Sequence, residues 1–103
     1  MTPLRGRVGK LPPYTKLRDL PGVGESIADD YIRIGINDPD QIRDADPEEL
    51  FDRLELLDGP TDRCVLYVFR CARYAMSTPE PDPSLLDWWA WKIERDRAGR
   101  AVS

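Results

Sequence analysis

The sequence predicts an all-α fold, a compact domain of five helices and a short helical connector. Apolar residues recur at helical spacing along most of the chain, and turns rich in glycine and proline separate these stretches. No stretch shows the strict alternation of a credible strand. The 103 residues suffice for one small domain with one core.

The first two helices are expected at about 14–20 and 24–34. The prolines at 12 and 13 favour extended backbone before the first helix, and Pro21 and Gly22 end it. Gly35 is predicted to cap the second helix in a left-handed conformation. The apolar side of that helix comprises Ile27, Ala28, Tyr31, Ile32 and Ile34.

A short helical turn is expected from Pro39 through Ile42, and a longer helix is expected to begin after it. Asp46 caps this next helix, Pro47 takes its first position and Glu49 completes a capping box. The helix ends before Gly59. Its buried stripe is predicted to comprise Leu50, Phe51, Leu54 and Leu57.

The longest helix, 61–76, is apolar around much of its girth and is therefore expected at the centre of the fold. After a proline-rich loop, Ser84 is predicted to cap a last helix at about 85–96. Helical spacing places Trp88 and Trp91 on one face of it and Trp89 on another. We expect a flexible basic arm at 1–12, the domain at 13–96 and a disordered tail at 97–103.

The net charge of −4 is unevenly distributed. Residues 1–18 hold five basic side chains and no acidic one, whereas the middle of the chain is acidic. No apolar run approaches the ~20 residues that cross a bilayer, and the N-terminus lacks a secretory signal. We therefore expect a cytoplasmic protein with no membrane contact.

The chain has no histidine, the commonest general base and a frequent zinc ligand. Cys64 and Cys71 lie about 10 Å apart along one helix, too far for a disulfide between them. They are expected to be buried reduced thiols. No spacing of acidic residues singles out a catalytic or metal site, so we expect no enzyme activity, no metal and no cofactor.

The run Leu20-Pro21-Gly22-Val23-Gly24 predicts a hairpin that can bind an anion. The two glycines permit positive φ and close approach, while Val23 points inward. Backbone N–H groups at the start of the following helix then face a phosphate. The predicted nucleic-acid-binding residues are Gly22, Val23, Gly24, Glu25 and Ser26, with Lys10, Lys16 and Arg18 adding positive charge.

Two alternatives remain open at this point. The hairpin is equally a tight turn between packed helices or a protein contact, and the acids Glu25, Asp29 and Asp30 oppose phosphate. The tryptophans either pack against helix 61–76 or present Trp89 as a stacking platform or partner anchor.

A shift of 37 residues superposes Leu17 on Leu54, Gly22 on Gly59 and Arg33 on Arg70. This echo fits a pseudo-two-fold pair of hairpins. The second hairpin is degenerate, because Pro60 lacks an N–H and the neighbouring Asp58 and Asp62 repel phosphate.

Several motifs closely resemble those of the bacterial pathogenicity-locus family of small helix-hairpin-helix proteins. The matching strings are Leu20-Pro21-Gly22-Val23-Gly24, Gly35-Ile36, Asp46-Pro47-Glu48-Glu49-Leu50, the run from Asp62 to Ala72, and Trp88-Trp89-Ala90-Trp91-Lys92. The resemblance covers about residues 14–93 and implies a tandem helix-hairpin-helix, SAM-domain-like fold with a DNA-binding role. The chain is also similar, less closely, to the C-terminal half of competence-regulator proteins.

The leading functional prediction is a non-catalytic module that binds nucleic acid, duplex DNA above all, weakly and independently of sequence. The alternative is an adaptor that binds a protein partner through an exposed patch near Trp89.

Overall fold

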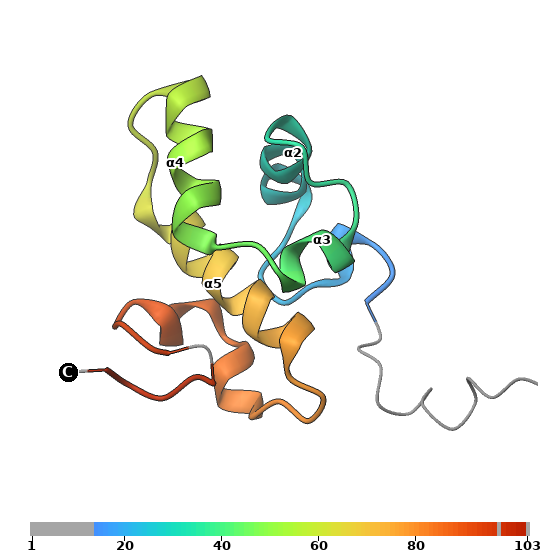
Figure 1. Cartoon of the computed structure of the whole chain (residues 1–103), viewed down its shortest axis with the longest axis vertical. Helices are drawn as coiled ribbons and strands as arrows, with labels where there is room; N and C mark the ends of the chain where they lie inside the picture. Colours follow the sequence, from blue (N-terminus) through green and yellow to red (C-terminus); the bar gives the residue numbers. More distant parts are fainter. Residues whose placement is uncertain (1–13, 97, 103) are drawn as a thin grey trace, which may run out of the picture.

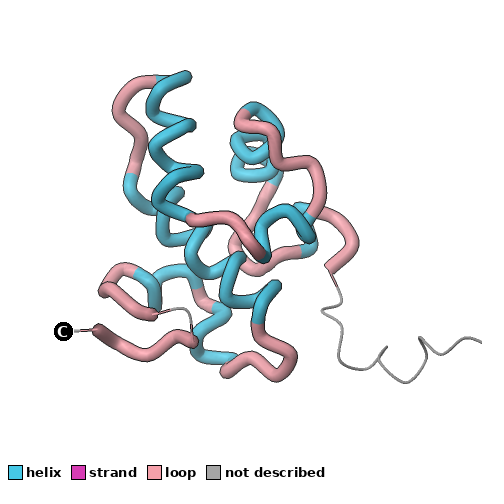
Figure 2. The backbone as a smooth tube through the Cα atoms, in the orientation of Figure 1, coloured by secondary structure: helices cyan, strands magenta, loops and turns pink. Residues whose placement is uncertain are grey.

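Apart from one isolated antiparallel bridge between Arg95 and Ala101, helices account for the secondary structure of residues 14–96 and 98–102, the part of the chain that the computed structural model describes (Figures 1 and 2). The all-α prediction is confirmed. Four α-helices and three short 3-10 turns follow in the order η1 (Leu17–Asp19), α2 (Glu25–Arg33), α3 (Pro39–Arg43), α4 (Pro47–Asp58), α5 (Arg63–Ser77), η2 (Pro83–Leu86) and η3 (Trp88–Trp91).

Helix α5 lies at the centre of the fold, as its sequence predicts (Figure 1). Helices α2, α3 and α4 lie on one side of it, and the C-terminal turns η2 and η3 lie on the other. Its apolar residues divide between these sides: Leu66 and Phe69 join a large cluster with α2, α3 and α4, and Cys71 and Tyr74 join a smaller one with Trp91. One helix therefore serves two cores, which explains its apolar girth.

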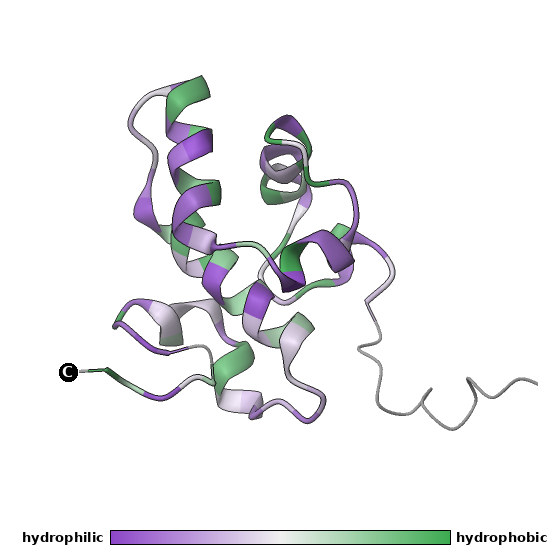
Figure 3. Ribbon diagram, viewed as in Figure 1, coloured by the Kyte–Doolittle hydropathy of each residue, from purple (hydrophilic) through white to green (hydrophobic). Residues whose placement is uncertain are grey.

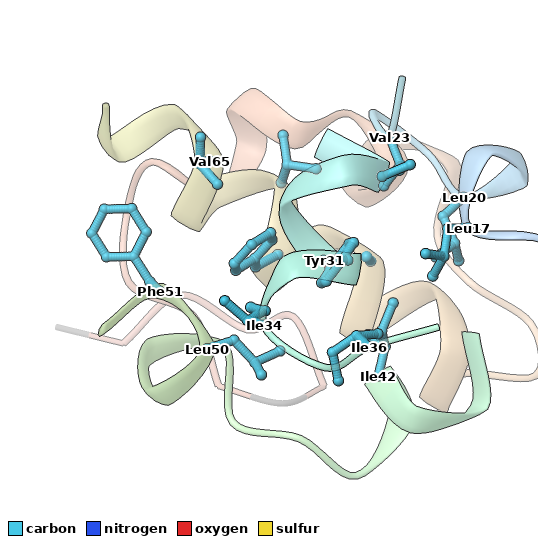
Figure 4. Close-up of a cluster of buried hydrophobic side chains, with 14 of the residues drawn as sticks. Leu17, Leu20, Val23, Tyr31, Ile34, Ile36, Ile42, Leu50, Phe51 and Val65 are labelled. Carbon is cyan, nitrogen blue, oxygen red and sulfur yellow. The ribbon is translucent and has the colours of Figure 1, made fainter. Parts of the chain in front are cut away.

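The larger cluster anchors the segment that precedes α2. Tyr31 stacks on Phe69 with ring centroids 4.4 Å apart. Leu17, Leu20 and Val23 lie together at one side of this cluster (Figure 4) and are buried. Three apolar side chains thus fix the backbone that leads into α2.

Aspartates cap three of the four α-helices. Asp38, Asp46 and Asp62 each accept a hydrogen bond from the amide two residues further on, at 2.9–3.0 Å. Gly35, with φ +95°, follows the end of α2, so the predicted left-handed conformation is confirmed. The predicted capping box with Glu49 is wrong, because the Glu49 carboxylate pairs with Arg53. The box forms instead at α3, between Asp38 and Gln41.

Two predicted helices are shorter than expected. Only the single turn η1 forms within 14–20, because Lys16 and Leu20 at its ends have extended backbone, and Leu20 precedes a proline. The segment 85–96 forms η2 and η3, separated at Asp87, rather than one helix. The Leu85 carbonyl accepts hydrogen bonds from the Trp91 indole and the Cys71 thiol, so tertiary contacts replace a helical bond there.

Three further details of the helices differ from prediction. The residue that caps η2 is Asp82 and not Ser84 as predicted. The Asp82 carboxylate accepts a hydrogen bond from the Ser84 amide at 3.0 Å. Leu57, predicted as buried, is 59% exposed, because the apolar end of α4 projects beyond the core (Figure 3). Ile32, predicted on the apolar side of α2, is 51% exposed.

Residues 98–102, within the segment predicted as a tail, fold back on the domain. The Val102 amide donates to the Glu94 carbonyl at 3.0 Å, and Arg95 donates to the Gly99 carbonyl at 2.8 Å. Gly99 is buried against Tyr74 and Leu85. The predicted basic arm, 1–12, with Lys10, lies outside the described residues.

Candidate nucleic-acid interface

The predicted hairpin is a tight turn between η1 and α2. The Val23 amide donates to the Leu20 carbonyl at 3.1 Å, which closes the turn over Pro21 and Gly22. Gly22 has φ +79°, as the third residue of such a turn requires. Gly24 differs from the expectation of positive φ: its φ is −93°. The space around Gly24 is open, since an added Cβ would meet no atom within 4 Å.

The start of α2 carries a set of backbone amides without acceptors. Among the described residues, the N–H groups of Gly22, Gly24, Glu25 and Ser26 form no hydrogen bond. The prediction that Val23 takes part in phosphate binding is wrong for its amide, because that amide closes the turn. The Val23 side chain is buried, as predicted. Ile27 is not among the predicted donors, but its amide also lacks an acceptor among the described residues. It is the third amide of a helix that has no side-chain cap.

Several amides of the second hairpin are occupied, although those of Asp62 and Arg63 form no hydrogen bond among the described residues. The Thr61 amide donates to the Glu55 carboxylate at 3.0 Å, and the Cys64 amide donates to Asp62 at 2.9 Å. Asp58 binds Arg33 at 2.6 Å, and this hydrogen bond lowers the pKa of the Asp58 carboxyl group. Among the described residues, the second hairpin therefore leaves fewer backbone amides free for an anion than the first.

The charges around the first hairpin are mixed. Arg33 also binds Asp30, so this acid is paired, although Asp30 and Asp58 share one positive charge. Glu25 and Asp29 form no ion pair among the described residues and remain as exposed negative charge. Lys16 and Arg18 are exposed and lie together, but at a pocket along the side of α2 that none of the residues from Gly22 to Ser26 lines. The predicted residues thus form two neighbouring groups rather than one.

The three tryptophans divide as their spacing predicts. Trp91 is buried, lies tilted against Tyr74 with ring centroids 5.4 Å apart, and donates its indole N–H to the Leu85 carbonyl. Trp88 is half-buried and lies 3.4 Å from the position of a Cβ on Gly22. Trp89 is 55% exposed and meets Trp88 edge-on. Two indoles therefore pack, and one faces solvent.

A family model described as pathogenicity locus matches residues 12–97. The chain belongs to the pathogenicity-locus family. One relative, the mitomycin resistance protein McrB of Streptomyces lavendulae, is 37% identical over 82 residues, which cover 79% of this chain and 74% of the relative. No solved structure matches the chain.

Two of the motifs that carry this chain's resemblance to the pathogenicity-locus family, the run from Asp62 to Ala72 and the tryptophan cluster, have structural roles. Asp62 caps α5, and Arg70 of the same run binds Glu48 at 2.6 Å and the Trp91 carbonyl at 3.1 Å. Trp91 lies beside Cys71, whose thiol burial raises its pKa to about 12. Cys71 and Cys64 are both free thiols. These family motifs therefore hold the C-terminal turns on α5.

The described part of this pathogenicity-locus protein holds no group of three or more side chains from His, Cys, Asp and Glu that could bind a metal ion. None of its described helices is long and apolar enough to span a membrane. The hairpin, the Lys16–Arg18 pocket and Trp89 are the surface features that call for a functional account.

Proposed function

We propose that this member of the pathogenicity-locus family is a non-catalytic module that binds duplex DNA independently of sequence. In this proposal, η1, the turn at Leu20–Gly24 and α2 are the phosphate-binding unit of a tandem helix-hairpin-helix arrangement. The second hairpin, at the end of α4, is its structural counterpart. The observation that carries the proposal is the set of unpaired amides at Gly22, Gly24, Glu25 and Ser26.

The absence of a cap on α2 supports this role. The other three α-helices each begin with an aspartate whose carboxylate accepts an amide hydrogen bond. Helix α2 begins with Gly24, which has no side chain to do so. The partial positive charge of this helix start therefore faces outward, where a phosphate oxygen can accept from the free amides. Contacts of this kind read no bases, so the binding is independent of sequence.

The charges make the proposed binding weak. Glu25 and Asp29 oppose a phosphate, and each costs about 0.3–1 kcal/mol at an exposed site. Lys16 and Arg18 act in the opposite direction, together with the basic residues of the segment before Tyr14. Binding should therefore fall steeply as salt screens these contacts and competes with them.

The test is fluorescence anisotropy with the full chain and two duplexes of unrelated sequence. We expect binding at about 50 mM salt, with equal dissociation constants for both duplexes. The double variant Lys16→Gln/Arg18→Gln should reduce the slope of log K against log salt by about 0.9 for each charge that contacts a phosphate. Absence of binding at about 50 mM salt would refute the proposal.

Trp89 supports a second candidate, a protein-interaction adaptor. An exposed indole is a frequent anchor in protein interfaces, and that of Trp89 is 55% exposed. A protein captured from a lysate by the wild-type chain, retained after nuclease treatment and lost with Trp89→Ala, would favour this function over DNA binding. Capture that nuclease abolishes would favour DNA.

A further inference from the structure

An open pocket of about 260 Å³ lies between η1 and the side of α2. Leu17 and Ala28, both buried in the core, contribute to its lining. Ile32, on the same face of α2 one turn after Ala28, contributes a side chain that is 51% exposed. A branched apolar side chain exposed beside buried ones is a ready contact for another apolar group.

Polar side chains at the pocket have unused hydrogen-bonding capacity. Among the described residues, Lys16 and Arg18 form no ion pair, and the side-chain amide of Asn37 forms no hydrogen bond. The nearby Asp19 carboxylate accepts from the Lys16 amide at 3.2 Å and the Thr15 hydroxyl at 3.4 Å. The two cations therefore remain as the unpaired charges of this pocket, and they favour an anionic ligand.

The positive charge and the apolar lining together restrict the class of ligand that fits this pocket. A DNA phosphate would satisfy the cations but has no use for the apolar contacts with Leu17, Ala28 and Ile32. The basic N-terminal segment of this chain, with Arg5, Arg7 and Lys10, carries the same charge as the pocket and is disfavoured as its occupant. A carboxylate next to an aliphatic side chain satisfies both parts of the lining.

We propose that this pocket binds an acidic peptide segment of a partner protein. One branched aliphatic side chain of the peptide packs on Leu17, Ala28 and Ile32, and a flanking carboxylate pairs with Lys16 and Arg18. The Asn37 amide bonds to the peptide backbone. The volume lies just below the range of about 300–1,000 Å³ that is typical of drug-sized ligands, and it suits a single anchoring side chain. This site shares Lys16 and Arg18 with the proposed DNA contact, whereas none of the residues from Gly22 to Ser26 lines it.

The test uses backbone amide NMR spectra of the full chain titrated with a blocked eight-residue peptide of core Glu-Leu-Asp. Control peptides carry Gln-Leu-Asn, which lacks charge, or Glu-Ser-Asp, which lacks the aliphatic group. We expect the first peptide to shift the amides of Leu17, Ala28 and Ile32. Both control peptides should bind at least about tenfold more weakly, which corresponds to about 1.4 kcal/mol.

A matched pair of variants separates the pocket from general surface effects. Ile32→Gln replaces an exposed aliphatic side chain inside the pocket and should weaken peptide binding about tenfold. Ile93→Gln replaces one of similar exposure, 52%, at a residue that does not line the pocket, and should change nothing. The proposal is overturned if the peptide shifts no pocket amide at about 5 mM, or if Ile32→Gln binds it as the wild type does.

Discussion

The substitution Gly24→Asp should stabilise the protein and weaken its binding to DNA at the same time. Gly24 has the extended backbone of an N-cap residue, with φ −93° and ψ −166°, and a Cβ there meets nothing within 4 Å. A new carboxylate can therefore accept from the Ser26 or Ile27 amide, as the aspartates of the other three α-helices do. The same carboxylate occupies the place proposed for the phosphate.

The size of the stability gain follows from three contributions. A side-chain cap in place of glycine is worth a few tenths of a kcal/mol, and the lost flexibility of glycine in the unfolded chain adds about 0.4–1 kcal/mol. The negative charge at the helix start adds about 0.3 kcal/mol or more. We expect a total near 1 kcal/mol, which raises the melting temperature by about 4–8 °C for a domain of this size.

The loss of binding should be larger for the charged residue than for its neutral analogue. Gly24→Asp blocks amides and adds repulsion, so the dissociation constant for a DNA duplex should rise at least about tenfold, or about 1.4 kcal/mol. Gly24→Asn blocks the amides without the charge and should show a smaller rise. Thermal denaturation and anisotropy at about 50 mM salt measure the two effects. A stabilised Gly24→Asp protein with unchanged DNA affinity would refute the proposed phosphate site.

Three further predictions concern stability. Arg70→Met should lower the free energy of unfolding by about 1–3 kcal/mol in urea denaturation, because the Trp91 carbonyl loses its donor. Glu48→Gln, which leaves that bond in place, should cost less, and an equal cost would contradict this reasoning. Gly59→Ala should cost about 1–3 kcal/mol, since φ +82° with ψ −167° is a conformation adopted almost exclusively by glycine. Gly59→Asn should not recover this loss, and a cost below about 0.5 kcal/mol for alanine would be inconsistent with the strain. The Cys71 thiol keeps its proton to about pH 12 in the folded protein, whereas the unfolded thiol ionises near 9.0, so its contribution to stability should fall as pH rises through that interval. Alkylation at pH 8 followed by mass spectrometry should find Cys71 protected until the chain unfolds, and rapid modification of the native protein would contradict its burial.

Local patterns predicted the parts of the fold that depend on local chemistry. The turn at Gly22, the cap at Asp46 and the central position of α5 each follow from residue types at fixed spacing. The boundaries failed where distant residues intervene. The Trp91 indole takes the Leu85 carbonyl from across the turn, and no helical periodicity reveals such a bond.

The candidate site was predictable in its position but not in its detail. The sequence predicts a turn at Gly22 and Gly24, and both residues lie there. Only the coordinates show that Gly24 has a negative φ and that the Val23 amide is hydrogen-bonded within the turn. The pairing of Arg33 with Asp58 joins residues 25 positions apart. Such a pair depends on how α2 and α4 pack, which composition and spacing leave open.

The contact between Trp88 and Gly22 has a consequence for how this protein can be dissected. Trp88 lies 3.4 Å from the place that a Cβ on Gly22 would take, so a segment late in the chain covers the turn that precedes α2. A fragment cut after Ser77 would retain every α-helix and still lose this support. A fragment made of the four described α-helices is therefore not a valid substitute for the full chain in binding experiments.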